Sequence, residues 1–184
     1  MKTTKSFLSN YHNKVLVFIL SLCILLSINV VPTYAYATLG YSIPNKKASF
    51  IWGDRVQGTG MIRSAWENAI KDWATASSAN FYNSSSSVNS LNSFYESSTT
   101  LYGKTNYTYF GSKITSFTAM VNAGNFNMTT NVSRSTANHE LGHVLGLDDI
   151  YSGTAIMNSN RNRSSLYLPQ TDDKNGVKAI YGSW

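Results

Sequence analysis

An apolar stripe of helical period marks the first half of the chain. Its residues recur at spacings of three, four, seven, eight and eleven positions, so they share one face of an α-helix; they are Ile62, Ala65, Trp66, Ala69, Ile70 and Trp73. Gly60 and Ser77 bracket the stripe. We predict a helix that packs its two tryptophans against a sheet.

Short β-rich segments lie on both sides of this helix. Residues 41–43 and 50–52 flank a turn at Pro44, and residues 107–110 and 114–121 are also rich in strand-forming side chains. In contrast, residues 83–100 are rich in Ser and Asn, which compete with their own backbone for hydrogen bonds. We therefore expect residues 83–100 to form a long surface connection with, at most, short structure around Leu91 to Tyr95.

A second amphipathic segment lies between residues 133 and 146. Ser133 or Ser135 could cap a helix here, and Gly146 is well placed to end it in a left-handed turn. The apolar side of this helix would carry Ala137, Leu141, Val144 and Leu145.

The rest of the chain is predicted to be irregular until Thr171. A last helix should begin there with acidic residues in its first turn, and it would bury Val177, Ile180 and Tyr181. Arg161 and Arg163 are expected on a solvated loop face.

The N-terminus has the pattern of a secretory signal. Lysines at positions 2, 5 and 14 precede an apolar run from Val15 to Val31, and Ala35-Tyr36-Ala37 forms a small-x-small cleavage site. We predict that residues 1–37 are removed, that the protein is secreted by a bacterium, and that no stable membrane association remains. A retained signal anchor is the alternative, and a lipid anchor at Cys23 is a weaker one.

Composition narrows the function of residues 38–184, which suffice for one domain. All nine acidic residues fall in this part, and three of the 15 basic ones precede it, so the formal charge of +6 falls to about +3. This mild charge gives no reason to expect nucleic acid as a partner. Since Cys23 is the only cysteine, the secreted part has no disulfide, cysteine ligand or cysteine nucleophile.

The segment His139-Glu140-Leu141-Gly142-His143 carries the clearest chemistry. Two imidazoles four residues apart on a helix lie on one face and can bind one zinc ion. Glu140 points about 100° away around the helix, where it can reach a water molecule on the metal as a general base.

A catalytic zinc ion needs a third protein ligand and an open position. Gly146 lets the chain turn back, and Asp149 follows three residues later. We predict Asp149 as the third ligand, and Asp148 remains the competing candidate.

Residues His139 to Asp149, H-E-L-G-H-V-L-G-L-D-D, resemble the extended zinc signature of the metzincin proteases, with Asp in the place of the third ligand as in the secreted bacterial snapalysin type. Met157, eight residues after Asp149, resembles the Met-turn of matrixins, and residues 172–182 resemble their closing helix. The resemblance implies an α+β, zincin-like single domain: a mixed twisted sheet with a long N-terminal helix, an active-site helix, and a small C-terminal subdomain ending in a helix. The upper subdomain would span about residues 38–146 and the lower one about 147–184.

The same resemblance implies a monomeric zinc endopeptidase that binds protein or peptide substrates along an edge strand. Thr115 to Val121 and Tyr107 to Phe110 are both candidates for this strand. One catalytic Zn²⁺ is expected, and Ca²⁺ sites cannot be assigned because the acids are few and dispersed. A catalytically silent, zinc-stabilised binding or adhesion module is the alternative function.

Overall fold

A computed structural model of the chain describes residues 36–183. It contains a five-stranded mixed sheet in the order β3-β2-β4-β6-β5. The strands are β2 (Lys47–Trp52), β3 (Asn80–Asn83), β4 (Ser90–Phe94), β5 (Gly103–Phe110) and β6 (Lys113–Asn122). Strands β3, β2, β4 and β6 run parallel, and β5 is antiparallel to β6 at one edge.

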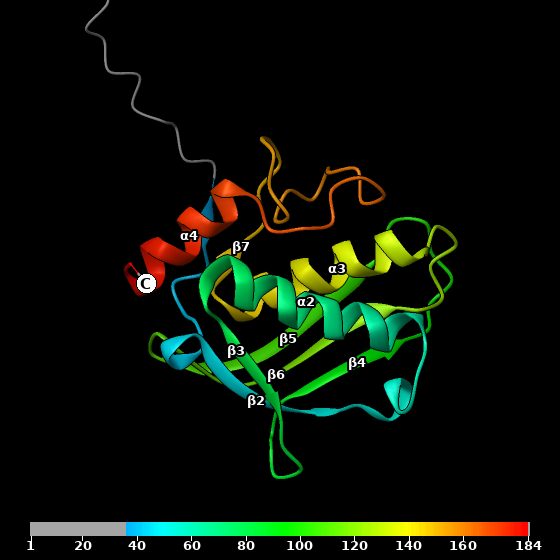
Figure 1. Ribbon diagram of the computed structural model, residues 1–184, viewed down its shortest axis with the longest axis horizontal. Helices are drawn as coiled ribbons and strands as arrows, with labels where there is room; N and C mark the ends of the chain where they lie inside the picture. The colour runs from blue at the N-terminus through cyan, green and yellow to red at the C-terminus, as the bar shows by residue number, and fades with distance from the viewer. Residues whose placement is uncertain (1–35, 184) are drawn as a thin grey trace, which may run out of the picture. The chain divides into compact units, whose positions relative to one another are not determined.

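Two long helices, α2 (Met61–Ser77) and α3 (Thr130–Val144), lie on the same face of this sheet (Figure 1). Strand β7 (Leu147–Asp148) follows the end of α3 and pairs with β1 (Ala37–Thr38), the first element of the chain. Helix α4 (Thr171–Tyr181) is the last element. The predicted α+β architecture, with its long first helix and its final helix, is confirmed. None of the helices within residues 36–183 has the length and apolar character needed to cross a membrane. The predicted signal peptide lies almost entirely outside these residues.

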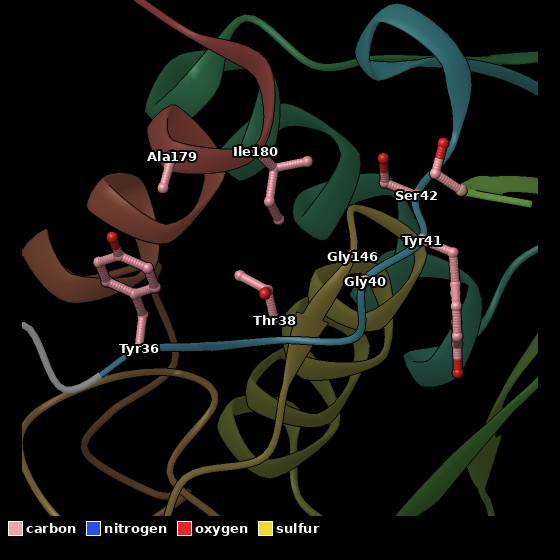
Figure 2. A pocket seen from close by; sticks show the side chains of 9 residues that line it. Tyr36, Thr38, Gly40, Tyr41, Ser42, Gly146, Ala179 and Ile180 are labelled. Atoms are coloured by element: carbon pink, nitrogen blue, oxygen red, sulfur yellow. The ribbon is translucent and has the colours of Figure 1, made fainter.

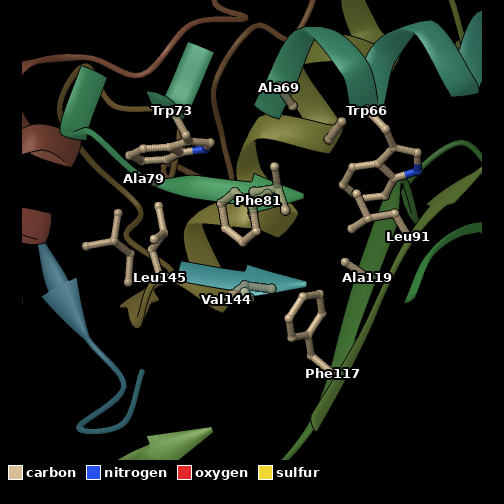
Figure 3. Close-up of a cluster of buried hydrophobic side chains, with 14 of the residues drawn as sticks. Trp66, Ala69, Trp73, Ala79, Phe81, Leu91, Phe117, Ala119, Val144 and Leu145 are labelled. Atoms are coloured by element: carbon tan, nitrogen blue, oxygen red, sulfur yellow. The ribbon is translucent and has the colours of Figure 1, made fainter. Parts of the chain in front are cut away.

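The core forms between α2, α3 and the sheet (Figure 3). Trp66 and Trp73 are fully buried, as the helical stripe predicts, and their indole N–H groups donate to the backbone oxygens of Asn92 and Asn138. Burying each of these side chains and satisfying its single donor stabilises the packing of α2 against both the sheet and α3.

The Ser- and Asn-rich segment departs from its prediction as a surface connection. Strand β4 lies in the middle of the sheet, between β2 and β6, and Leu91 is fully buried. The polar residue just before the strand supports it: the Asn89 side chain donates to the backbone oxygen of Ser49 and accepts from the backbone N–H of Phe117. Hydrogen bonds on both edges of the strand outweigh its weak β propensity.

Two further predicted boundaries are wrong. Residues 41–43 form only a bridge from Ser42 to Lys113, not a strand. Helix α3 begins before Ser133, because the Thr129 hydroxyl accepts a hydrogen bond from the backbone N–H of Val132 and so caps it. The serines instead bind carbonyl groups: Ser135 donates to the backbone oxygen of Leu166.

Gly146 follows α3 with a φ of +93°, the left-handed region that favours glycine. The chain segment before β2 passes directly beside it (Figure 2). A Cβ atom at this position would lie 2.8 Å from the backbone oxygen of Tyr41 and from the Cβ of Ser42. The glycine therefore lets the chain reverse after α3 at a point of close backbone approach.

Candidate metal centre and catalytic cleft

The two histidines of the motif lie on the last turns of α3, and their rings meet edge to face. Their ring centroids are 4.7 Å apart. Each ring is held by a backbone oxygen: His139 Nδ1 lies 3.0 Å from the oxygen of Ile156, and His143 Nδ1 lies 2.9 Å from that of Leu147. A carbonyl oxygen can only accept, so these contacts are hydrogen bonds in the tautomer that carries its proton on Nδ1, and in that tautomer both Nε2 atoms present a lone pair toward the same point.

Asp149 comes back to this point after the Gly146 turn. Its Oδ1 lies 3.2 Å from His139 Nε2 and 4.0 Å from His143 Nε2. The Ser159 hydroxyl donates to the same oxygen at 2.7 Å. Among the described residues, His139, His143 and Asp149 form a group whose candidate ligand atoms lie within 4.8 Å of one another. Asp148 is outside this group, and its carboxylate accepts instead from the backbone N–H of Asp149.

This donor set fits a zinc ion. Ligands at about 2.0–2.1 Å from a tetrahedral zinc ion lie about 3.3 Å from each other, close to the 3.2 Å and 4.0 Å found here. The lone pairs of His139 Nε2 and Asp149 Oδ1 also face each other, so a proton or a cation must lie between them.

Charge favours the cation. Burial lowers the pKa of His139 more than its contact with Asp149 raises it, so the neutral imidazole is favoured. Burial raises the pKa of Asp149, but the contacts with His139 and Ser159 outweigh it and hold this pKa well below its usual range. The carboxylate is thus ionised, and a cation that takes the place of the imidazole proton would keep the attraction that lowers its pKa.

Glu140 is buried next to the two histidines and is oriented by the edge strand. The Thr105 hydroxyl donates to its carboxylate at 2.8 Å. A Cβ atom on Gly103 would lie 2.5 Å from the other carboxylate oxygen, so glycine gives Glu140 its room. Together with the three candidate ligands these residues line a cavity of about 310 Å³.

Met157 lies under the histidine-bearing turns. It is buried, and a Cβ atom on Gly142 would lie only 2.3 Å from its sulfur. The glycine between the two histidines therefore allows the methionine to contact the helix at the centre of the motif. This is the place that the resemblance implies for a Met-turn.

Two residues that support the site were not identified from the sequence. Asp173, expected simply as an acid in a helix's first turn, is buried and accepts hydrogen bonds from the backbone N–H groups of Ile156 and Met157. Arg161, expected on a solvated face, is buried and donates to Ser135 and to the backbone oxygen of Asn158. Only the place of Asp173 in the first turn of the last helix gave any signal in the sequence.

The edge of the sheet beside the site belongs to β5. Strand β6, which contains Thr115 to Val121, already pairs with β4 and β5 and has no free edge. That candidate for the substrate strand is therefore excluded. Strand β5 includes Tyr107 to Phe110, and its beginning lines the cavity at Gly103 and Thr105.

The chain is similar to known proteins in its family pattern and in its fold. The matrixin peptidase family matches residues 37–182. No curated protein sequence matches the chain. Among the solved structures that match is one described as the GM1-bound form of the ECX AB5 holotoxin, with 17% identity, a TM-score of 0.55, and coverage of 80% of this chain and 87% of that one. At this identity the likeness concerns the fold alone.

Proposed function

The chain belongs to the matrixin family of zinc metallopeptidases, and we propose that it is a secreted endopeptidase in which His139, His143 and Asp149 hold zinc and Glu140 is the general base. The observation that carries this proposal is the convergence of two Nε2 atoms and one carboxylate oxygen beside a buried glutamate. A purely structural zinc site has no use for such a glutamate, whereas a hydrolytic site requires a base at this position.

The residues of the chain have separate tasks in the proposed reaction. Zinc, when bound, would acidify a water molecule and polarise the scissile carbonyl group. Glu140 takes the proton from the attacking water and passes it to the leaving amine. The Thr105 hydroxyl keeps its carboxylate oriented toward the cavity. No covalent acyl intermediate is needed, because the water molecule is itself the nucleophile.

Substrate would extend along β5. Its outer edge has no strand partner among residues 36–183, and an added peptide strand would pass the cavity at Gly103 and Thr105. This geometry supports protein or peptide substrates that bind in an extended conformation.

Substitution of Glu140 tests the base. Glu140→Ala should lower the rate of casein or peptide cleavage by at least about a thousandfold while zinc still binds in one-to-one amount. The exposed Glu96 provides a control, and Glu96→Ala should keep full activity. Retained cleavage by Glu140→Ala would remove the assigned base.

The third ligand needs its own test. Asp149 brings a negative charge to the ligand set where a third imidazole would bring none, so Asp149→His should move the acid limb of the pH–rate profile to lower pH. A limb that stays in place or moves upward would argue against Asp149 as a ligand and against the snapalysin-type assignment.

A binding or adhesion module without catalytic activity is the competing function. Zinc binding by itself does not distinguish this function from a peptidase, because both would hold the metal. Cleavage of casein or gelatin that is lost with a chelator and restored by added zinc supports the peptidase. Folded, zinc-loaded protein without any cleavage would favour the module.

Export is part of the proposal, and the packing of the first described residues suggests where processing occurs. Ala37 pairs with Asp148 in the β1–β7 ladder, and a Cβ atom on Gly176 in α4 would lie 3.1 Å from the Cβ of Tyr36. Since Tyr36 and Ala37 are part of the fold, we place the cut before Tyr36, after the small-x-small sequence Thr33-Tyr34-Ala35. N-terminal sequencing of the secreted protein should find Tyr36 as its first residue. A first residue of Thr38 would instead place the cut after Ala35-Tyr36-Ala37.

A further inference from the structure

A second cavity of about 460 Å³ lies at the start of β5 and α3, and none of the residues that line it is acidic. Its walls include Tyr102, Thr129, Val132, Arg161, Asn162 and Arg163. Two of these residues are arginines.

This cavity is next to the catalytic cleft. Tyr102 precedes Gly103, where an added Cβ atom would lie 2.5 Å from a Glu140 carboxylate oxygen. On the other wall, Arg161 Nη1 lies 3.2 Å from His139 Nδ1. A peptide that extends along β5 past Glu140 would therefore place a neighbouring side chain, or its own end, at this cavity.

Neither arginine forms an ion pair with a carboxylate of the described residues. Among residues 36–183 no carboxylate oxygen lies within 4.0 Å of Arg161 or Arg163. Arg161 is held by neutral acceptors at Ser135 and Asn158. Burial lowers the pKa of Arg163, and the longer-range attraction of Tyr102, Glu140 and Asp149 offsets this only in part.

Arg163 makes fewer hydrogen bonds within the protein than Arg161 does. Its guanidinium lies 4.1 Å from the centre of the Tyr102 ring, and Nη2 donates to the backbone oxygen of Ser159. Its Nε is buried without a hydrogen-bond partner. A half-buried guanidinium can form strong, charge-assisted hydrogen bonds with an incoming carboxylate through its accessible N–H groups.

We propose that this cavity binds a carboxylate group of the substrate through Arg163, with Arg161 supplying further positive charge. The inference rests on the proposed peptidase function and deepens it. In an unmodified peptide the carboxylate comes either from an Asp or Glu side chain next to the scissile bond or from a free C-terminus. Either source would make acidity close to the cleavage point a determinant of specificity.

Matched peptides test the proposal. Fluorogenic peptides would carry either Glu or Gln at one of the three positions on each side of the scissile bond. Each peptide would be made once with a free C-terminus and once with an amidated one. We expect wild-type enzyme to favour the carboxylate at one place by about tenfold or more in kcat/KM.

Variants of Arg163 locate the source of this preference. Arg163→Gln should reduce the Glu-to-Gln ratio to within about twofold, and Arg163→Lys should retain part of it. The exposed Arg55 provides a charge-matched control, and Arg55→Gln should leave the ratio unchanged.

The outcomes separate the two proposals. Wild-type enzyme that cleaves Glu and Gln peptides equally, at every position and with either end, overturns the carboxylate subsite and leaves the peptidase function intact. A preference that survives Arg163→Gln also overturns it. Zinc-loaded enzyme that cleaves no peptide removes the peptidase function, and this inference with it.

Discussion

Two regions of this molecule supply the candidate zinc ligands, and different forces hold them in place. The histidines lie on α3, which packs against α2 through apolar side chains such as the fully buried Trp73. Asp149 begins a stretch that continues to Gln170 without a helix or a strand. This returning segment, residues 149–170, still contains buried residues, including Ile156 and Met157.

In the returning segment, hydrogen bonds to a few polar side chains add to the apolar packing of residues such as Ile156 and Met157. Asp173 accepts from two of its backbone N–H groups, and Ser159 donates to Asp149. The Ile156 oxygen in turn accepts from the His139 ring. The packed region should therefore govern the stability of the fold, whereas the polar contacts should govern the geometry and zinc affinity of the site.

Trp66→Ala should have the largest effect, because it removes a fully buried side chain from the packed region. We expect the free energy of unfolding to fall by about 3–5 kcal/mol, measured by urea denaturation. Zinc affinity of the folded protein should change little. Lys71→Ala, at an exposed position on the same helix, is the control. A large loss of zinc affinity in folded Trp66→Ala protein would break the distinction between the regions.

Asp173→Ala should lower the free energy of unfolding by about 2–4 kcal/mol, since it leaves buried N–H groups of Ile156, Met157 and Gln170 without their acceptor. Unlike the tryptophan variant, it should also weaken zinc binding by about tenfold or more, because the Ile156 backbone orients His139. Competition with a chromogenic chelator would measure this. Asp172→Ala, one residue earlier, should do neither.

Gly142→Ala places a methyl group where Met157 contacts the helix, and we expect a destabilisation of about 1–3 kcal/mol from overpacking. Combining it with Met157→Ala should cost less than the sum of the two single changes, because the smaller side chain makes room. Additive effects in thermal or urea unfolding would show that the two residues do not press against each other.

Ser159→Ala should have the smallest effect on folding, about 1 kcal/mol or less, because it removes a single hydrogen bond at the Asp149 carboxylate. Zinc affinity should fall by no more than about tenfold. Ser164→Ala, at an exposed position in the same segment, is the control. An unchanged zinc affinity would mean that Ser159 does not help to position Asp149.

The sequence predictions were more accurate for the packed helices than for the segments that polar contacts hold in place. The period of Ile62 to Trp73 predicted α2 because a buried helical face must repeat every three to four residues. Short structure around Leu91 to Tyr95 was allowed, and β4 lies there, but its central place in the sheet was not predicted because its side chains are mostly polar and its pairing with β2 and β6 is not visible locally. The start of α3 was misplaced because Thr129, Ser133 and Ser135 are all good capping residues, and only backbone geometry distinguishes them.

By itself the sequence determined the helical face of His139 and His143, the position of Glu140 beside them and the turn at Gly146, since spacing along one helix is a local property. Only the tertiary structure decided between Asp148 and Asp149 as the acid that meets the histidines, and between β5 and β6 as the free edge. It alone brought Asp173 and Arg161 under the site. These choices depend on contacts between segments far apart in the chain, which no local pattern encodes.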